Sequence, residues 1–242
     1  MTEKIICIIL AVVLLALVFI LPKVLESNKT DKQPTTSAQA TTQDPYEGLD
    51  VLELEDYPTE VKFPNDYLLV YERMDDSNIV IIEKGSNYLV EDTAENTYGG
   101  LFVTKEADTY YYRSLQRNGS WGNKSVINRS GSSYMENELT KDRWEYPKKF
   151  LIDLKKSFKD SGKNIYISTP EIIGGIKCEH YIVKSAWFEY NYWVHAKTNV
   201  TLKYSKVEVR FGERNTAFEI TAQKFTDKPS FEGYLSEELI PD

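Results

Sequence analysis

Hydrophobic and polar residues follow three successive patterns along this chain. Residues 5–21 form an unbroken run of 17 apolar residues, bounded by Lys4 and Pro22. Residues 27–44 consist almost entirely of small polar residues, lysine, aspartate, alanine and proline. From residue 68 onward, apolar and polar residues mostly alternate, which is the period of a half-buried β-strand. The pattern therefore predicts an apolar segment, a spacer and one β-rich domain.

The apolar segment is interpreted as an uncleaved transmembrane anchor. A helix of this length covers roughly 25 Å, near the lower limit for a bilayer core and longer than the apolar region of most signal peptides. A cleaved signal peptide is the alternative, but no small-x-small cleavage site follows the segment closely. The expected organisation is a short tail at residues 1–4, a transmembrane anchor at 5–22, a disordered stalk at 23–45 and a β-rich extracytoplasmic domain at 46–242.

Two signals oppose each other on the orientation of this anchor. Lys4 precedes it, whereas Lys23, Lys29 and Lys32 follow it, and the positive-inside rule then favours a cytoplasmic C-terminus. Residues 27–44, however, cannot bury enough apolar surface to become ordered, and such a solvated spacer lifts a domain off a membrane. We give the spacer more weight. The expected location is a bacterial plasma membrane, crossed once, with the C-terminal domain extracytoplasmic.

Short β-forming segments follow one another closely in the domain, with little helical spacing between them. This arrangement predicts a mainly β fold with a curved antiparallel sheet. The candidate strands are residues 67–73, 79–83, 88–91, 101–105, 109–114, 165–168, 177–184, 188–195, 200–204, 206–211 and 218–225. The apolar phase slips by one residue between the segments at 200–204 and 206–211, which predicts a bulge or break near Ser205 and Lys206.

One segment, residues 147–160, has helical spacing instead and is expected to dock on the sheet as an amphipathic helix. Its apolar residues are Phe150, Leu151, Leu154 and Phe158. Its opposite face carries Lys148, Lys149, Lys155, Lys156 and Lys159. These lysines are interpreted either as a solvated face or as a contact with anionic lipid headgroups.

Charge and candidate chemistry narrow the function. The chain carries a net charge of −8, which makes it a poor binder of polyanions, so nucleic acid is not an expected partner. Its two cysteines are Cys7 and Cys178, and only the second lies in the domain, where it is expected to be a small buried hydrophobe. His180 and His195 have no partners at metal-ligand spacing. No enzyme motif is present, so neither catalysis nor a cofactor or metal is expected.

Residues 174–204 carry a family resemblance. Gly174 and Gly175 lead into a strand with Tyr181, and the next hairpin contains Trp193 and, further on, Leu202. This segment resembles the bacterial lipoprotein-carrier superfamily (LolA, LolB and LppX-like proteins), and the strand rhythm extends the likeness to about residues 68–230. The resemblance implies a half-open β-barrel, with one or two covering helices, whose concave side holds acyl chains. An anchored domain could not act as a free shuttle, however.

These observations leave two main functions open. The first is binding of a lipid, an acyl chain, including that of a lipoprotein, or another hydrophobic ligand. Its expected cavity is lined by Phe150, Leu151, Leu154, Phe158, Phe188, Tyr190 and Tyr192. The alternative is a non-catalytic envelope interaction or sensing module with a filled core. A more distant reading is that exposed Tyr and Trp rings bind cell-wall glycan.

The orientation of the anchor is directly testable. A reporter enzyme that is active only outside the cytoplasm, fused after Asp242, is expected to be active because the spacer holds the domain outside. The measurement is reporter activity in intact cells, with a cytoplasm-specific reporter at the same position as the control. Activity of the cytoplasmic reporter alone would reverse the orientation.

Overall fold

A computed structural model describes residues 45–53, 57, 63–94, 99–107, 109–127, 145–155 and 164–241. The contacts divide the chain into two units, residues 1–47 and 48–242, and every described strand and helix belongs to the second. Among the described residues, no helix is long and apolar enough to span a membrane. The expected anchor at 5–22 and all but the last residue of the expected stalk lie outside the described residues.

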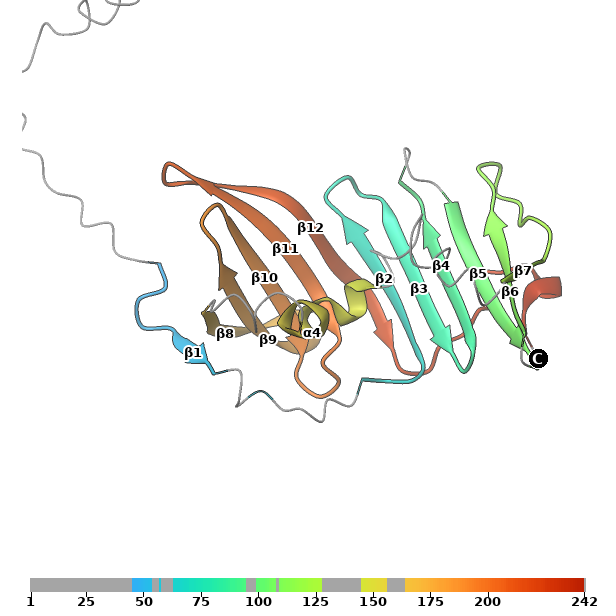
Figure 1. Cartoon of the computed structure of the whole chain (residues 1–242), viewed down its shortest axis with the longest axis horizontal. Helices are drawn as coiled ribbons and strands as arrows, with labels where there is room; N and C mark the ends of the chain where they lie inside the picture. The colour runs from blue at the N-terminus through green and yellow to red at the C-terminus, as the bar shows by residue number, and fades with distance from the viewer. Residues whose placement is uncertain are drawn as a thin grey trace, which may run out of the picture. The chain divides into compact units, whose positions relative to one another are not determined.

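Twelve antiparallel strands of the described residues form one sheet, which Figure 1 shows. They are β1 (Asp50–Leu52), β2 (Tyr67–Arg73), β3 (Asn78–Lys84), β4 (Asn87–Asp92), β5 (Gly99–Glu106), β6 (Thr109–Leu115), β7 (Ser125–Ile127), β8 (Ile165–Ile173), β9 (Ile176–Lys184), β10 (Phe188–His195), β11 (Thr201–Arg210) and β12 (Glu213–Thr226). Their order is β1-β8-β9-β10-β11-β12-β2-β3-β4-β5-β6-β7, so the sheet does not close on itself. The expected mainly β fold with a curved antiparallel sheet is confirmed.

The pairing of β12 with β2 joins two runs of neighbouring strands, β8 to β12 and β2 to β7. Ile220 lies opposite Arg73 at one end of this pairing, and Phe225 lies opposite Leu69 near the other. The register shifts between Ala222 and Lys224, and such a bulge bends a strand and increases its twist. Alternation along each strand does not indicate this long-range pairing.

Most expected strands are present, and two have the expected bounds, β2 and β10. The segments expected at 200–204 and 206–211 form one strand, β11, whose register with β12 shifts between Lys206 and Val207. The expected bulge is therefore confirmed within a continuous strand. The sequence did not predict β1 and β7, because each has three residues and depends on its neighbour for its geometry.

Both faces of the sheet are covered near β3. Ile79 and Ile81 belong to a large core cluster on the face that also contacts the helix, whereas Val80 and Ile82 belong to a second cluster on the other face. That second cluster also includes Phe231 and Leu239, which follow β12 in the chain. Leu239 belongs to the 3-10 turn η4 (Glu237–Leu239). A strand buried on both faces reads as a continuous apolar run rather than as an alternation.

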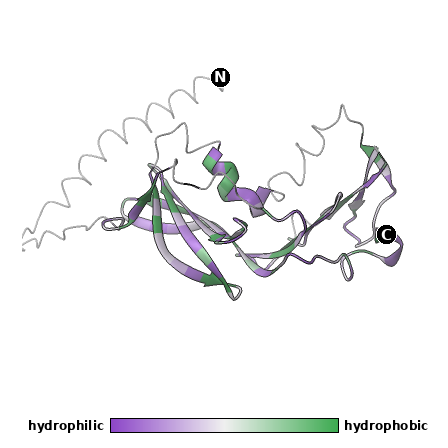
Figure 2. Cartoon of the chain, turned by 90° about the horizontal axis from the view of Figure 1, so that it is seen from below, coloured by the Kyte–Doolittle hydropathy of each residue, from purple (hydrophilic) through white to green (hydrophobic). Residues whose placement is uncertain are grey.

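A short helical segment confirms part of the helix expected at residues 147–160. It consists of the 3-10 turn η2 (Tyr146–Lys148), with Pro147 in its first turn, followed by α4 (Lys149–Asp153). Figure 2 shows α4 on the concave side of the bent sheet. Residues 156–163 lie outside the described residues, so the far end of the expected helix is not described.

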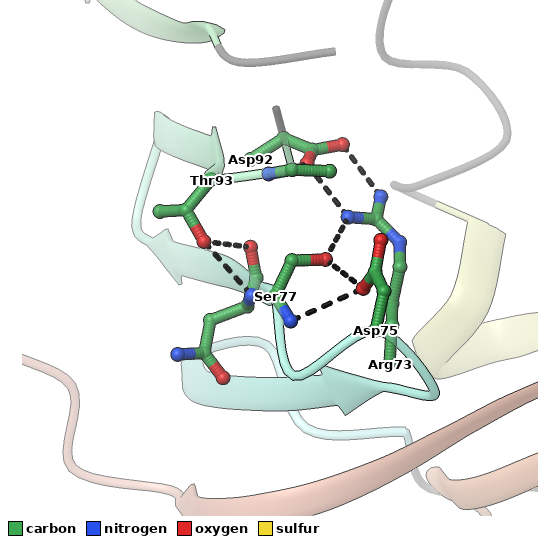
Figure 3. A network of polar contacts seen from close by, with 7 residues as sticks. Arg73, Asp75, Ser77, Asp92 and Thr93 are labelled. Atoms are coloured by element: carbon green, nitrogen blue, oxygen red, sulfur yellow. Dashed lines mark hydrogen bonds and ion pairs between the residues drawn. The ribbon is translucent and has the colours of Figure 1, made fainter. Parts of the chain in front are cut away.

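An ion pair stabilises the turns beside the concave face (Figure 3). The two terminal nitrogens of Arg73 donate to the two carboxylate oxygens of Asp92 over 2.7 and 2.6 Å. Arg73 also donates to the hydroxyl of Ser77, which in turn lies within hydrogen-bond distance of Asp75. The Asp92 side chain is almost fully buried, so its charge depends on this bidentate contact.

Replacement of Asp92 by Asn should therefore destabilise the domain by about 3 kcal/mol, because it leaves the Arg73 charge partly buried without its counter-ion. Chemical denaturation of the two proteins measures this loss. The Glu106→Gln variant is the control. It removes a charge from the exposed pair with Lys124 and should cost less than about 1 kcal/mol. Equal losses in both variants would contradict the role given to burial.

Glu91 should make the stability depend on pH. It lies on β4, with Val80 and Gly100 as its cross-strand neighbours, and burial raises the pKa of its carboxyl to about 7. The folded protein therefore binds more protons than the unfolded chain between the ordinary pKa of 4.5 and this value, and its stability falls as the pH rises through that window. In the Glu91→Gln variant, the denaturation midpoint should fall less as the pH rises from 4.5 to about 7. An unchanged decline would assign it to other groups.

Candidate functional site

The candidate site lies where α4 meets β9, β10 and β11. Phe150 is fully buried and Leu154 nearly so, and both belong to the core cluster on this face. The backbone N–H of Phe150 donates to the hydroxyl of Thr201 on β11 over 3.2 Å. Thr201 is itself fully buried, so this hydrogen bond satisfies two polar groups and fixes the start of the helix on the sheet.

Aromatic rings fill the space between Phe150 and the sheet. Its ring stacks on Tyr181 of β9 with centroids 4.5 Å apart and planes 11° apart. Tyr57 approaches edge-on at 5.4 Å, and Tyr192 of β10 lies at 5.3 Å. Rings at these separations attract one another beyond the gain from burial alone. Phe150 is thus a central packing residue of the core.

Polar groups lie at the border of this aromatic cluster. The hydroxyl of Tyr192 donates to Asp153 of α4 over 2.8 Å, and Lys149 Nζ lies 3.0 Å from the other carboxylate oxygen. Burial, and secondly the charge of Asp153, raises the pKa of Tyr192 well above its ordinary value. The hydroxyl of Tyr71 donates to the carbonyl of Thr201. These phenols are therefore neutral donors that attach the helix to the sheet.

Aromatic residues on this face become more exposed toward the turns that precede β10 and β12. Tyr190, Lys206 and Phe218 lie side by side on β10, β11 and β12, and all three are partly exposed. Phe188 is also partly exposed, with its ring 6.2 Å from Tyr190. We call these four residues the aromatic shelf. Phe218 also lies 5.9 Å from Tyr146 of η2, so the shelf is on the same face as α4.

The expected cavity residues thus divide into three groups. Phe150, Leu154 and Tyr192 are buried in the aromatic cluster, whereas Leu151, Phe188 and Tyr190 are partly exposed. Phe158 lies outside the described residues. Phe188 and Tyr190, the two aromatic residues of the partly exposed group, belong to the aromatic shelf.

The expected lysine stripe is also divided. Lys148 lies 3.6 Å from Glu83 and above the ring of Phe63, and Lys149 pairs with Asp153. Both are therefore engaged within the domain. Lys155 is exposed, and Lys156 and Lys159 lie outside the described residues, so contact with lipid headgroups stays a prediction.

Alternation did not predict a polar network on the opposite face of β10. His180 stacks on Trp193 at 4.2 Å, and its Nε2–H donates a 3.0 Å hydrogen bond to the amide oxygen of Asn191. Asn191 donates to the buried Glu189, which also accepts a hydrogen bond from Arg214 over 2.5 Å. Burial lowers the pKa of His180 below its ordinary value. Both faces of β10 are therefore covered, contrary to the pattern of a strand with one solvated face.

Sequence reasoning also missed several residues of the aromatic cluster. Tyr181 and Tyr204 lie directly opposite Tyr192 on the neighbouring strands, so knowledge of the strand register would have placed both. Tyr57 gave no signal because it precedes the alternating region. The sequence did not indicate a role for Thr201, because that role depends on a hydrogen bond from Phe150, which lies 51 residues earlier in the chain.

Potential metal ligands and a free cysteine occur in the described part of the chain. There, no three His, Cys, Asp or Glu side chains converge where they could hold a metal ion. Cys178 is a fully buried free thiol, as expected, and burial raises its pKa to about 11. A thiol with such a pKa is protonated at neutral pH and is a poor nucleophile.

The sequence matches no protein-family model and no curated protein. Among solved structures, MucB is similar at 11% identity and a TM-score of 0.35, over 76% of this chain and 59% of MucB. The Pseudomonas aeruginosa MucA/MucB complex gives 12% and 0.34, over 73% of this chain and 57% of that one. A putative outer membrane lipoprotein-sorting protein domain from Vibrio parahaemolyticus gives 10% and 0.24, over 72% and 88%. Likenesses this low do not establish a shared fold.

The packing around Phe150 generates a stability prediction. Replacement of Phe150 by Ala should cost about 3–5 kcal/mol, since it opens a cavity among rings that cannot collapse around the gap. Replacement of Phe188 by Ala is the matched control. This ring is partly exposed on the shelf, so its removal should cost clearly less. Chemical denaturation distinguishes the two, and equal losses would show that the shelf is as tightly packed as the core.

Proposed function

We propose that this chain is a membrane-tethered, non-catalytic domain of the bacterial envelope that binds an acyl chain or a similar apolar ligand. The aromatic shelf carries this proposal. Partly exposed rings on the concave face continue directly from a buried aromatic cluster, and binding sites for small apolar ligands are concave and lined by such rings. The tether and the extracytoplasmic location rest on residues 5–22 and 27–44.

The form of the shelf suits a long, narrow ligand. Tyr190, Lys206 and Phe218 form a row across three strands, and Phe188 extends the row along β10. An acyl chain that lies across this row would cover ring faces which water now contacts. The gain is about 25 cal/mol for each Å² of apolar surface removed from water. The half-open barrel of the lipoprotein carriers would provide the same kind of concave surface.

Lys206 suggests which headgroup the ligand carries. Its ammonium group lies 3.9 Å from the centroid of the Phe188 ring and 6.0 Å from that of Tyr190. Among the described residues no carboxylate forms an ion pair with Lys206. A cation that is held over aromatic rings attracts an anion, so a fatty acid or an anionic lipid fits better than a neutral hydrocarbon.

A second function, an envelope interaction or sensing module with a filled core, is favoured by one specific observation. The ring of Phe150, on α4, stacks on Tyr181 and contacts Tyr192 of the sheet, so the protein itself occupies this part of the concave side. If the rest of the face is filled as well, the shelf would contact a protein rather than a lipid. The two functions differ in whether a free amphiphile binds.

Binding of a photoreactive long-chain fatty acid to the full-length chain in amphipol tests the proposal. Crosslinks should map to the shelf, and Lys206→Gln should weaken binding about tenfold, the usual worth of a hydrogen bond to a charged group. The matching fatty alcohol should bind the variant and the unmodified protein equally. The measurement is crosslinking yield as a function of probe concentration.

Lys84→Gln is the control, because it removes a charge from an exposed lysine at the end of β3 and should leave binding unchanged. Phe188→Asp should reduce the yield with both probes, since it places a carboxylate among the rings. Absence of saturable crosslinking, or crosslinks that persist in Phe188→Asp, would contradict ligand binding at the shelf and favour the interaction module.

A further inference from the structure

Two large apolar side chains are exposed together at one end of the sheet. Trp187 lies in the turn between β9 and β10, and Phe211 lies in the turn between β11 and β12. The backbone N–H of Val209 donates to the carbonyl of Trp187 over 2.9 Å, which places Phe211 only two residues beyond this contact. Both turns lie at the same end of the sheet in Figure 1. We call Trp187 and Phe211 the aromatic tip.

The fold does not explain these residues. Phe211 is fully exposed, at 101% of its reference area, and Trp187 is 58% exposed. Phe211 also has φ of 51° and is followed by Gly212 at 85°, a turn in which Asn, Asp or Gly is the usual residue at the first position. A bulky residue in this left-handed region is strained. Phe211 thus costs stability and contributes no internal packing.

Basic residues accompany the tip. Residues 184–189 and 206–214 contain four basic residues and three acidic ones, whereas the whole chain carries a net charge of −8. Two of the basic residues, Arg210 and Arg214, pair with Glu208 and Glu189. These two ranges therefore carry a net charge of +1, so the acidic excess of the chain lies outside them and does not oppose contact with an anionic surface.

We propose that the aromatic tip inserts into the interfacial region of a lipid bilayer and docks the domain on the membrane. Trp is enriched at this region because its ring combines an apolar body with one polar N–H group. Two rings bury at most about 250 Å² each, whereas a stable protein interface needs about 800 Å² per partner. A bilayer, unlike a protein partner, can accept two inserted rings without a surface that is complementary in shape. This inference goes beyond the proposed function, because it requires no bound ligand.

Quenching of tryptophan emission by brominated lipid tests the insertion. The full-length chain is placed in nanodiscs that hold one chain each and contain phosphatidylglycerol and phosphatidylcholine brominated near the headgroup. The quenched emission is expected to disappear in Trp187→Phe, although the chain has three other tryptophans. Phe211→Asp should lower the ratio of inserted to free tip roughly tenfold or more.

Two controls keep the outcome interpretable. Val126→Asp changes another exposed apolar residue, on β7, and should leave the quenching unchanged. Phe211→Asn places a favoured residue in the turn, so it should raise the unfolding temperature while it weakens insertion. The proposal is overturned if quenching persists in Trp187→Phe, or if Phe211→Asp has no effect. It is also overturned if a change in Trp187 emission requires several chains per bilayer, which would indicate a second copy as the partner.

The shelf and the tip can fail separately. Lys206→Gln should weaken fatty-acid crosslinking about tenfold and retain quenching. Phe211→Asp should lower quenching and retain crosslinking. Loss of quenching in both variants would show that insertion depends on bound ligand, and would overturn the tip as an independent membrane contact.

Discussion

The antiparallel pairing of β12 with β2 is the constraint on which the rest of the structure depends. Without it, β8 to β12 and β2 to β7 would be two separate sheets, each with an open edge at this position. The helical segment lies across this junction, since Tyr146 contacts Tyr71 of β2 at 6.3 Å and Phe218 of β12 at 5.9 Å. The bulge between Ala222 and Lys224 bends the last strand at the same place. The concave face therefore exists because one pairing unites both halves.

Tyrosine side chains make the concave face apolar and also form hydrogen bonds that attach the helix to the sheet. The chain has 17 tyrosines, and those beneath the helix bury their rings while their hydroxyl groups meet acceptors at the border. Tyr192 donates to Asp153, and Tyr71 donates to the carbonyl of Thr201. Phenylalanine at these positions would provide packing but would remove the donor to Asp153 and the donor to the carbonyl of buried Thr201. The result is a broad core whose helix is attached by directional contacts.

Burial decreases steadily along the face, from the helix toward the turns. Phe150 and Tyr192 are buried, Tyr190 and Phe188 are partly exposed, and Phe211 is fully exposed. This gradient follows from geometry, because Phe150 of α4 lies against Tyr192 of β10 and Thr201 at the start of β11, whereas Trp187 and Phe211 lie in turns at the other end of these strands.

The sequence alone determined the local features of this domain. Alternation indicated β2, β10 and the bulge at Lys206, and helical spacing indicated the segment with Phe150 and Leu154. Tertiary structure decided that β12 pairs with β2, that both faces of β10 are covered, and that Tyr57, Tyr181 and Thr201 surround Phe150. The physical reason is the range of the interactions. Backbone alternation and turn chemistry act between neighbours, whereas burial of a given side chain depends on strands and helices that are distant in the chain and are brought together only by folding.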